Sequence, residues 1–381
     1  MTLNEKYECY VKEIEEAHIW QGILYPGFLF KPEVLNDIQS FKVRKDDIFI
    51  ATFPKSGTTW TAEIVSLIKS EVNIPFVKSL DISERVIHLE TPPNRSLKLL
   101  EDLGSPRIFG THLPFHLLPD SIKKGDCKVI YVMRNPKDVA VSFYHHHRMA
   151  KDLGNFSGSF KDFLALFSAG KTVCGSWFDH VIGYWEQTEK NILFLKYEDM
   201  KKNFRENIEK IADFLGADLS DEQIFKVLNH CSFESMQKNE KANRDWIPIF
   251  DKSKGNFMRK GIVGDWKNYF DQQDNQAFMS LYHAKMGQYT NLKFEFEIPL
   301  QPRLLPNQPN KKTNFSAKNS TPLSITNSSP QENEYSSSST DNAFNSINYE
   351  SSIKFINNNV FAYHERSLLS TSPTSPLFIV R

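Results

Sequence analysis

The sequence predicts an α/β fold in which a parallel sheet is covered by helices on both faces. Short apolar runs rich in β-branched and aromatic residues alternate along the chain with longer segments of helical periodicity, an order typical of βαβ units. One run, residues 127–134, is almost continuously apolar, as expected for a strand buried on both faces. Ligands bind such sheets at the carboxyl ends of the strands, so the polar residues after each run are the first site candidates.

Four strands and three helices can be placed from the pattern. The predicted strands are 48–52 (IFIAT), 107–113 (RIFGTHL), 127–134 (CKVIYVMR) and 191–198 (NILFLKYE). The predicted helices are 60–70, 135–151 and 203–216. Pro136 is tolerated in the first turn of a helix, and Gly216 is a common residue at a helix C-terminus. Both residues therefore support the proposed boundaries.

The chain divides into two regions of different composition. Residues 1–298 have the apolar patterning of one globular domain, whereas residues 299–381 include runs rich in Ser and Asn such as SAKNSTPLSITNSSP. Such a segment has too little apolar surface to offset its ordering entropy. We expect a low-complexity, disordered tail. Its last residues, SPLFIVR, are apolar enough to be a short binding motif instead.

Composition excludes several classes of function. The formal net charge is zero over 381 residues, which offers no bulk attraction for nucleic acid. The four cysteines form no CxxC pair, and neither a signal peptide nor a run of about 18 apolar residues is visible. We therefore expect a cytoplasmic protein with no membrane or nucleic-acid partner. The thirty phenylalanines fit either a core or an apolar pocket, and four of them, Phe28, Phe30, Phe115 and Phe143, are suggested for such a pocket but fit a core equally well.

The segment TFPKSGTTW (52–60) has the properties of a phosphate-binding loop. It links a predicted strand to a predicted helix and supplies a cation, a flexible glycine and hydroxyl donors, namely Lys55, Ser56, Gly57, Thr58 and Thr59. Amides that open a helix bind anions well. The loop is P-loop-like but not a Walker A motif, because Lys55 precedes the glycine. An ordinary strand-to-helix turn is the alternative.

Other candidates follow the remaining strands. His112 comes at the end of 107–113, where it could accept a proton near neutral pH. Arg134 ends 127–134, with Ser142 eight residues later. Arg suits phosphate through its planar fork, although pairing with nearby Asp138 explains Arg134 equally well. Arg259 and Lys260 lie between glycines, where a solvated basic loop is the ordinary reading.

Together these strings resemble the cytosolic sulfotransferase family over roughly residues 20–295, with at least five motifs in the family order. PKSGTTW resembles the family's 5′-phosphosulfate loop. The resemblance implies that Lys55 contacts the phosphosulfate and stabilises the leaving oxygen, and that Trp60 packs on adenine rather than being a plain core aromatic. GTHLP resembles the segment of the catalytic base, His112. Many members carry Lys where this chain has Gly110, so one positive charge is missing here.

The resemblance also implies a complete site for 3′-phosphoadenylyl sulfate (PAPS). YVMRNPKDVAVS matches the 3′-phosphate motif through Arg134 and Ser142, and RKGIVGDWK matches the segment that closes over the nucleotide. Tyr197 and the CSFESM segment match the adenine site, although Cys231 replaces a common Thr. The remaining residues assigned to the nucleotide are Ser232, Phe233, Met236, Phe257, Met258, Arg259, Lys260 and Gly261.

The implied reaction moves a sulfonate group from PAPS to a small-molecule hydroxyl without a metal. No Walker B acid follows the third predicted strand, and the three histidines 145–147 point in different directions on a helix. The alternatives are a small-molecule kinase, an inactive nucleotide-binding protein of the same fold, and a dehydratase that sulfonates an alcohol and then eliminates sulfate. The family's dimer motif KxxxTVxxxE is degraded in KNYFDQQDNQ (267–276), so a homodimer is left open.

Overall fold

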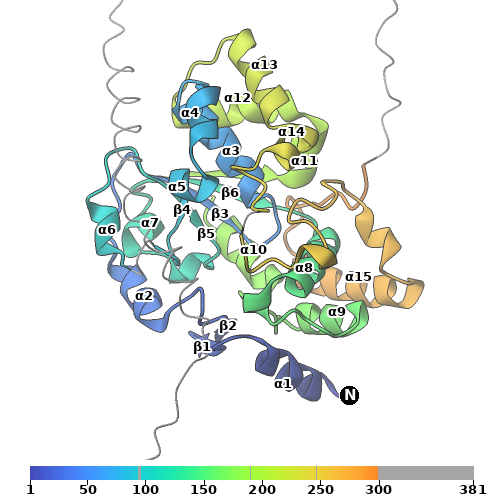
Figure 1. Ribbon diagram of the computed structural model, residues 1–381. Coiled ribbons are helices and arrows are strands. Elements are labelled where there is room, and N and C mark those ends of the chain that lie inside the picture. Colours follow the sequence, from blue (N-terminus) through green and yellow to red (C-terminus); the bar gives the residue numbers. More distant parts are fainter. Residues whose placement is uncertain (93–95, 189, 246, 299–381) are drawn as a thin grey trace, which may run out of the picture.

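The computed structural model describes residues 1–298 except 93–95, 189 and 246 (Figure 1). The predicted tail 299–381 lies outside the described residues. The strands are β1 His18–Trp20, β2 Ile23–Tyr25, β3 Ile48–Thr52, β4 Ile87–His88, β5 Ile108–Thr111, β6 Lys128–Met133 and β7 Ile192–Lys196. The helices are α1 Leu3–Glu13, α2 Pro32–Asp37, α3 Thr58–Lys69, α4 Ile74–Ser79, α5 Ile82–Arg85, α6 Lys98–Glu101, α7 Asp120–Lys124, α8 Pro136–Met149, α9 Phe160–Ser168, α10 Trp177–Trp185, α11 Tyr197–Lys202, α12 Phe204–Leu215, α13 Asp221–His230, α14 Phe233–Lys238 and α15 Gln272–Met286.

The central sheet is parallel, as predicted. Five strands lie in the order β4-β5-β3-β6-β7, and every neighbouring pair is parallel. All four predicted strands are present. The first has the predicted bounds, 48–52, and the other three are slightly shorter; β4 is an additional edge strand of two residues. A separate antiparallel hairpin, β1–β2, was not predicted. These short strands carry too few residues to show a period of two.

Helices cover both faces of this sheet because successive strand residues point to opposite sides. In β3, Ile48 and Ile50 pack into one apolar cluster with α3 and α12, whereas Phe49 and Ala51 pack into another with α8 and α10. All five residues of β3 are buried, which explains the continuous apolar pattern. Figure 1 shows α3, α12 and α13 on one side of the sheet and α8, α10 and α15 on the other.

The strand register brings the carboxyl ends of the strands to one edge. Ala51 pairs with Thr111 of β5, and Thr52 pairs with Val132 of β6. The residues that follow β3, β5, β6 and β7 in the chain therefore leave the sheet side by side. No helix among the described residues has the length and apolar character needed to cross a membrane.

Candidate active site

A cavity of about 410 Å³ lies at the carboxyl edge of the sheet. Its wall includes the first residue after each of three strands, namely His112 after β5, Arg134 after β6 and Tyr197 after β7. The loop after β3 contributes Lys55 and Gly57. A cavity of this size fits a small-molecule site, and the topology places the charged residues of separate motifs around one space.

The loop after β3 has the backbone of an anion cradle. Lys55 has a φ of 68° and Gly57 a φ of 117°, so both occupy the left-handed region. Gly57 is the N-cap of α3, where a Cβ would lie 3.1 Å from a ring carbon of Tyr197. The hydroxyl of Ser56 is buried and has no hydrogen-bond partner among the described residues. The first amides of α3 and this hydroxyl can therefore donate to a bound anion.

Lys55 lies in a strongly cationic environment. Its Nζ is 4.0 Å from the centre of the Phe257 ring. Burial, followed by the charges of Arg244, Arg134 and Arg259, lowers the pKa of Lys55 to about 7. A bound polyanion would offset these charges and restore the protonated form. Lys55 is therefore suited to stabilise negative charge on a ligand.

His112 is held in one orientation by backbone and side-chain contacts. Its Nδ1 lies 2.8 Å from the carbonyl oxygen of Thr52, which can only accept, so Nδ1 carries the proton and Nε2 has the lone pair. Burial, together with the charges of Arg244 and Lys55, lowers the pKa of His112 to about 4. The hydrogen bond to Thr52 acts in the opposite direction. The ring is thus a neutral base near pH 7.

A buried carboxyl group fixes the backbone around His112. Oε1 of Glu90 accepts from the backbone N–H of His112 at 2.5 Å and from the hydroxyl of Thr111 at 2.7 Å. Burial raises the pKa of Glu90, although these hydrogen bonds oppose the shift. On the other side, the carbonyl oxygen of His112 lies 3.2 Å from Nε2 of His180. Both contacts restrain the position of the histidine relative to β5.

Arg134 connects the phosphate-loop backbone to a distant segment. Its Nη1 donates to the carbonyl oxygen of Lys55 at 3.3 Å and its Nη2 to that of Ile262 at 2.9 Å. The guanidinium lies 4.3 Å from the centre of the Tyr197 ring. Asp138 is 3.8 Å away, so it is a loose partner, and the buried Nε has no partner among the described residues.

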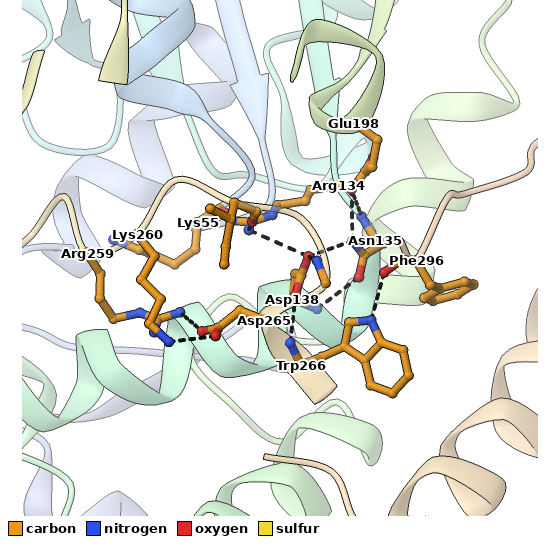
Figure 2. Close-up of polar contacts among 12 residues, drawn as sticks. Lys55, Arg134, Asn135, Asp138, Glu198, Arg259, Lys260, Asp265, Trp266 and Phe296 are labelled. Atoms are coloured by element: carbon orange, nitrogen blue, oxygen red, sulfur yellow. Dashed lines mark hydrogen bonds and ion pairs between the residues drawn. The ribbon is translucent and has the colours of Figure 1, made fainter. Parts of the chain in front are cut away.

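The basic segment Phe257–Gly261 is held against α8 through Asp138. The carboxylate of Asp138 accepts from the backbone N–H groups of Gly264 at 2.8 Å and Trp266 at 3.0 Å (Figure 2). Figure 2 also shows Arg259 and Lys260 both reaching Asp265, at 2.5 and 2.7 Å. Two cations share one carboxylate, so this segment retains positive charge beside the cavity.

A family model described as "Sulfotransferase domain" matches residues 45–290, which is more than half of the chain and includes every residue discussed above. The chain belongs to the sulfotransferase family. Curated relatives agree. Identity is 44% over 269 residues to Sulfotransferase 1B1 of Canis lupus familiaris, covering 69% of this chain and 90% of the relative. Identity is 40% over 296 residues to Sulfotransferase 1E1 of Homo sapiens, covering 76% of this chain and 98% of the relative.

Solved structures of sulfotransferases share the fold. One is retinol dehydratase in complex with androsterone and inactive cofactor PAP, with a TM-score of 0.68, 29% identity, and coverage of 77% of this chain and 95% of that one. Another is mouse sulfotransferase SULT7A1 complexed with PAP, with a TM-score of 0.60, 35% identity, and coverage of 71% and 95%. The predicted fold class, a P-loop-like parallel sheet, is confirmed.

In this sulfotransferase, the predicted adenine residues gather at one end of the cavity. The indole Nε1 of Trp60 donates to the backbone carbonyl of Cys231 at 2.9 Å. Because this contact uses the backbone, it does not depend on whether residue 231 is Cys or the Thr common in the family. Most of the predicted nucleotide residues line the cavity, namely Lys55, Gly57, Thr58, Thr59, Trp60, Arg134, Ser142, Tyr197, Cys231, Phe233, Met236, Phe257, Met258, Arg259, Lys260 and Gly261. Ser56 and Ser232 are not part of the wall, and Ser232 instead caps α14.

Gly110, where many members have Lys, is close to a histidine from the neighbouring strand. A Cβ at Gly110 would lie 2.8 Å from Nε2 of His88, the last residue of β4. The His88 ring also lies 5.0 Å from that of His112, centre to centre. His88 therefore occupies space that a side chain at position 110 would need.

Several wall residues were not found from the sequence. They include Arg244, His88, His146, Asp152 and a group of apolar side chains, among them Leu29, Ile247 and Phe250. Of the four phenylalanines suggested for a pocket, Phe30 and Phe143 line it, whereas Phe28 and Phe115 do not. Of the residues missed, only His88 ends a strand, the two-residue β4, and none follows a strand that the sequence predicted.

The three consecutive histidines have different neighbours. His145 contacts the hydroxyl of Tyr269 at 2.7 Å and His147 that of Tyr10 at 2.8 Å, while His146 lines the cavity. No cluster of metal-ligating side chains is found among the described residues. In the degraded dimer motif, Asp271 caps α15 and Lys267 pairs with Glu297.

Proposed function

We propose that this sulfotransferase transfers a sulfonate group from PAPS to a hydroxyl group of a small acceptor, with residues 1–298 as its catalytic domain. The observation that carries this proposal is the convergence of His112 and Lys55 on one cavity. His112, which follows β5, supplies a neutral base, and Lys55, in the loop after the neighbouring strand β3, supplies a cation. Both are needed if a hydroxyl is to lose a proton while a leaving oxygen gains charge.

The donor set fits the nucleotide. Ser56 Oγ, Arg134 Nε and Arg259 Nε are buried without a partner among the described residues, as expected of donors awaiting an anion. We assign the 5′-phosphosulfate to the loop of Lys55 and the 3′-phosphate to Arg134, Ser142 and the Arg259–Gly261 segment. Adenine is assigned to the end formed by Trp60, Tyr197 and the Cys231–Met236 segment. PAP, the product of PAPS, is named in both structures compared above.

The proposed chemistry is an in-line displacement. Nε2 of His112 takes the acceptor's hydroxyl proton while that oxygen attacks sulfur. The bond from sulfur to the bridging phosphate oxygen breaks, and Lys55 stabilises the charge left on that oxygen. A transferring sulfonate carries less charge than a phosphoryl group, so Lys55 and the helix amides suffice without a metal ion. Holding both reactants in one cavity supplies further rate.

The acceptor is proposed to carry an apolar or aromatic body. Beyond His112 the cavity wall is formed by side chains such as Phe30, Phe143 and Phe250, which suit such a body.

Elimination after sulfonation is a second candidate, because retinol dehydratase is among the similar structures. All four cysteines are free thiols, which supports a reducing, cytoplasmic setting.

The test is calorimetric binding of adenosine 3′,5′-bisphosphate (PAP), compared with AMP and with Mg-ATP. We expect metal-independent binding that falls about tenfold or more in Arg259→Ala, because a charge-assisted contact is lost. Lys252→Ala, which removes an exposed cation from the same loop, should bind PAP as the wild type does. A preference for Mg-ATP, or no PAP binding, would overturn the proposal. Product analysis with PAPS then separates a sulfate ester from an alkene with free sulfate.

A further inference from the structure

Arg244 is a cation in the cavity wall that forms no ion pair with any residue the structure describes. Its side chain lines the cavity and is partly buried. Within the described part of the chain, its guanidinium makes no ion pair, and its Nε is buried without a hydrogen-bond partner. Such a group is costly unless a ligand supplies the missing acceptor.

Nearby carboxyl groups do not fill this role. The charge of Asp81 acts on Arg244 against the effect of burial, but no ion pair joins the two among the described residues. Oδ1 of Asp81 accepts from the amide of Ser83 at 2.9 Å and from the Ser83 hydroxyl at 2.6 Å. Asp152 also lines the cavity, and burial raises its pKa to about 6. No ion pair joins Asp152 to Arg244 among the described residues. A carboxylate on a ligand would supply the ion-pair partner that the described residues do not.

The position of Arg244 is at the reacting end of the cavity rather than the adenine end. The guanidinium lies 5.7 Å from the centre of the Phe257 ring, and Nζ of Lys55 lies 4.0 Å from the same ring. Burial and the Arg244 charge both lower the pKa of His112. Phe250, which stacks on Phe257 with centres 5.5 Å apart, also lines the cavity and belongs to none of the nucleotide motifs.

The backbone that carries Arg244 is firmly anchored. Arg244 has a φ of 60°, a costly conformation for a residue with a side chain. On one side, Asn243 donates to the carbonyl of Gln237 at 3.0 Å. On the other, the amide of Lys151 donates to the carbonyl of Ile249 at 3.0 Å, next to the Ala150–Phe250 bridge. Strain held in place by surrounding contacts is common at ligand sites.

We propose that the acceptor of this sulfotransferase is a hydroxylated organic acid, whose carboxylate binds the guanidinium of Arg244 while its hydroxyl faces His112. This inference rests on the proposed function. The donor nucleotide is matched by Lys55, Arg134, Arg259 and Lys260 in its own motifs, and Arg244 belongs to none of them. A guanidinium can bind a carboxylate with two parallel hydrogen bonds, and the apolar wall accommodates the body between the two groups.

The test compares acceptors that differ only in charge. Three 4-hydroxyphenyl acids, with one, two or three methylenes before the carboxylate, are each paired with the neutral carboxamide. With wild type and PAPS, we expect kcat/KM to favour at least one acid over its amide by about tenfold or more, as for a charged hydrogen bond. Arg244→Gln should abolish this preference, lowering kcat/KM for the acid far more than for its amide, and Arg244→Lys should keep part of it. Lys252→Gln should behave as wild type.

Two results would overturn the inference. In the first, no acid is preferred by the wild type. In the second, Arg244→Gln lowers the rates for acid and amide equally, which would place the guanidinium on the transferring sulfonate instead. PAP binding and sulfonation of the neutral phenol 2-naphthol, measured alongside, separate this failure from that of the proposed function. If the enzyme binds PAP and sulfonates 2-naphthol but does not prefer the acids, only the inference about an acidic acceptor is wrong. If it neither binds PAP nor sulfonates 2-naphthol, the proposed function itself is wrong.

Discussion

The Nδ1–H of His112 donates to the carbonyl oxygen of Thr52 over 2.8 Å, from the end of β5 to the end of β3. This contact joins the base candidate to the strand that leads into the phosphate loop. It determines the tautomer of the ring, because a carbonyl oxygen cannot donate. The lone pair of Nε2 is therefore available to a proton donor, and its position is tied to the backbone that also carries Lys55.

Replacing His112 with Ala should remove the base without removing the nucleotide site. We expect kcat to fall by about 10²–10⁴-fold, the usual contribution of general base catalysis, while PAP affinity stays within about twofold of wild type because no phosphate contact is lost. Steady-state kinetics and calorimetry measure the two effects. His283→Ala, an exposed histidine on α15, is the control. Full activity in His112→Ala would exclude His112 as the base.

The pH dependence of kcat/KM for PAPS should be bell-shaped. Activity should rise with pH as His112, whose pKa is about 4, loses its proton. It should fall as pH rises through about 7, where Lys55 of the free enzyme loses its charge. Lys55→Arg keeps a cation at all these pH values, so whatever its rate, its profile should lack the alkaline limb. An alkaline limb near pH 7 in that variant would assign it to another group.

The strand-end residues of the site could be predicted from the sequence because topology alone brings them together. His112, Arg134 and Tyr197 each follow a strand that the apolar pattern reveals, and parallel strands end at a common edge. The candidate phosphate loop could also be located from the sequence, because a cation, a glycine and hydroxyls stand together between a strand and a helix. At these positions, the sequence pattern locates the end of each strand, and the parallel topology then brings those ends together.

The rest of the wall depends on long-range packing that no local pattern encodes. Arg244 lies in an irregular segment. Its charge draws attention only in the folded structure, where no ion pair to it is found among the described residues. His88 ends a strand of two residues, too short to recognise. The close approach of His88 to Gly110 could not be read from either residue, because it depends on the pairing of β4 with β5.

Asp138 should control nucleotide affinity by positioning the basic segment. Its carboxylate accepts from the amides of Gly264 and Trp266, and Asn at this position offers only one acceptor oxygen. We expect Asp138→Asn to weaken PAP binding by about tenfold or more, because hydrogen bonds to a charged group are lost. AMP binding should change less, since AMP has no 3′-phosphate. An equal loss for both ligands would contradict a role confined to the 3′-phosphate segment.

The space at Gly110 should be available only when His88 is small. Gly110→Ala places a Cβ 2.8 Å from the His88 ring, and relieving such overpacking costs about 1–3 kcal/mol. Because the His88 ring neighbours that of His112, acceptor kcat/KM should fall. Adding His88→Ala should restore activity and stability relative to Gly110→Ala alone, a non-additivity measured by a double-mutant cycle. Gly183→Ala, whose Cβ has no neighbour closer than 4.0 Å, is the control. Additive effects would show that the two positions do not compete for space.

A buried ionic network joins α3, α5 and α13 and should dominate the stability of that region. Glu63 of α3 is fully buried, and its carboxylate accepts from Arg85 and from His230, each at 2.7 Å. Burial tends to raise the pKa of Glu63, but His230 and Arg85 outweigh it and hold the pKa below its usual range. Stability from this shift is present above the unfolded pKa of about 4.3 and is lost as pH falls through the folded value.

Glu63→Gln should therefore lower the free energy of unfolding by about 3–5 kcal/mol at pH 7, because it removes the negative partner of a buried ion pair. Urea unfolding of the full chain at pH 7 measures the loss, and the difference from wild type should narrow as pH falls below about 4. The control is Glu206→Gln, which breaks the exposed pair with Lys210 and should cost at most about 1 kcal/mol. Equal losses in the two variants would mean that the buried network contributes no more than a surface pair. In that case Trp60 would be held in place by its hydrogen bond to Cys231 and by apolar contacts, without help from the network.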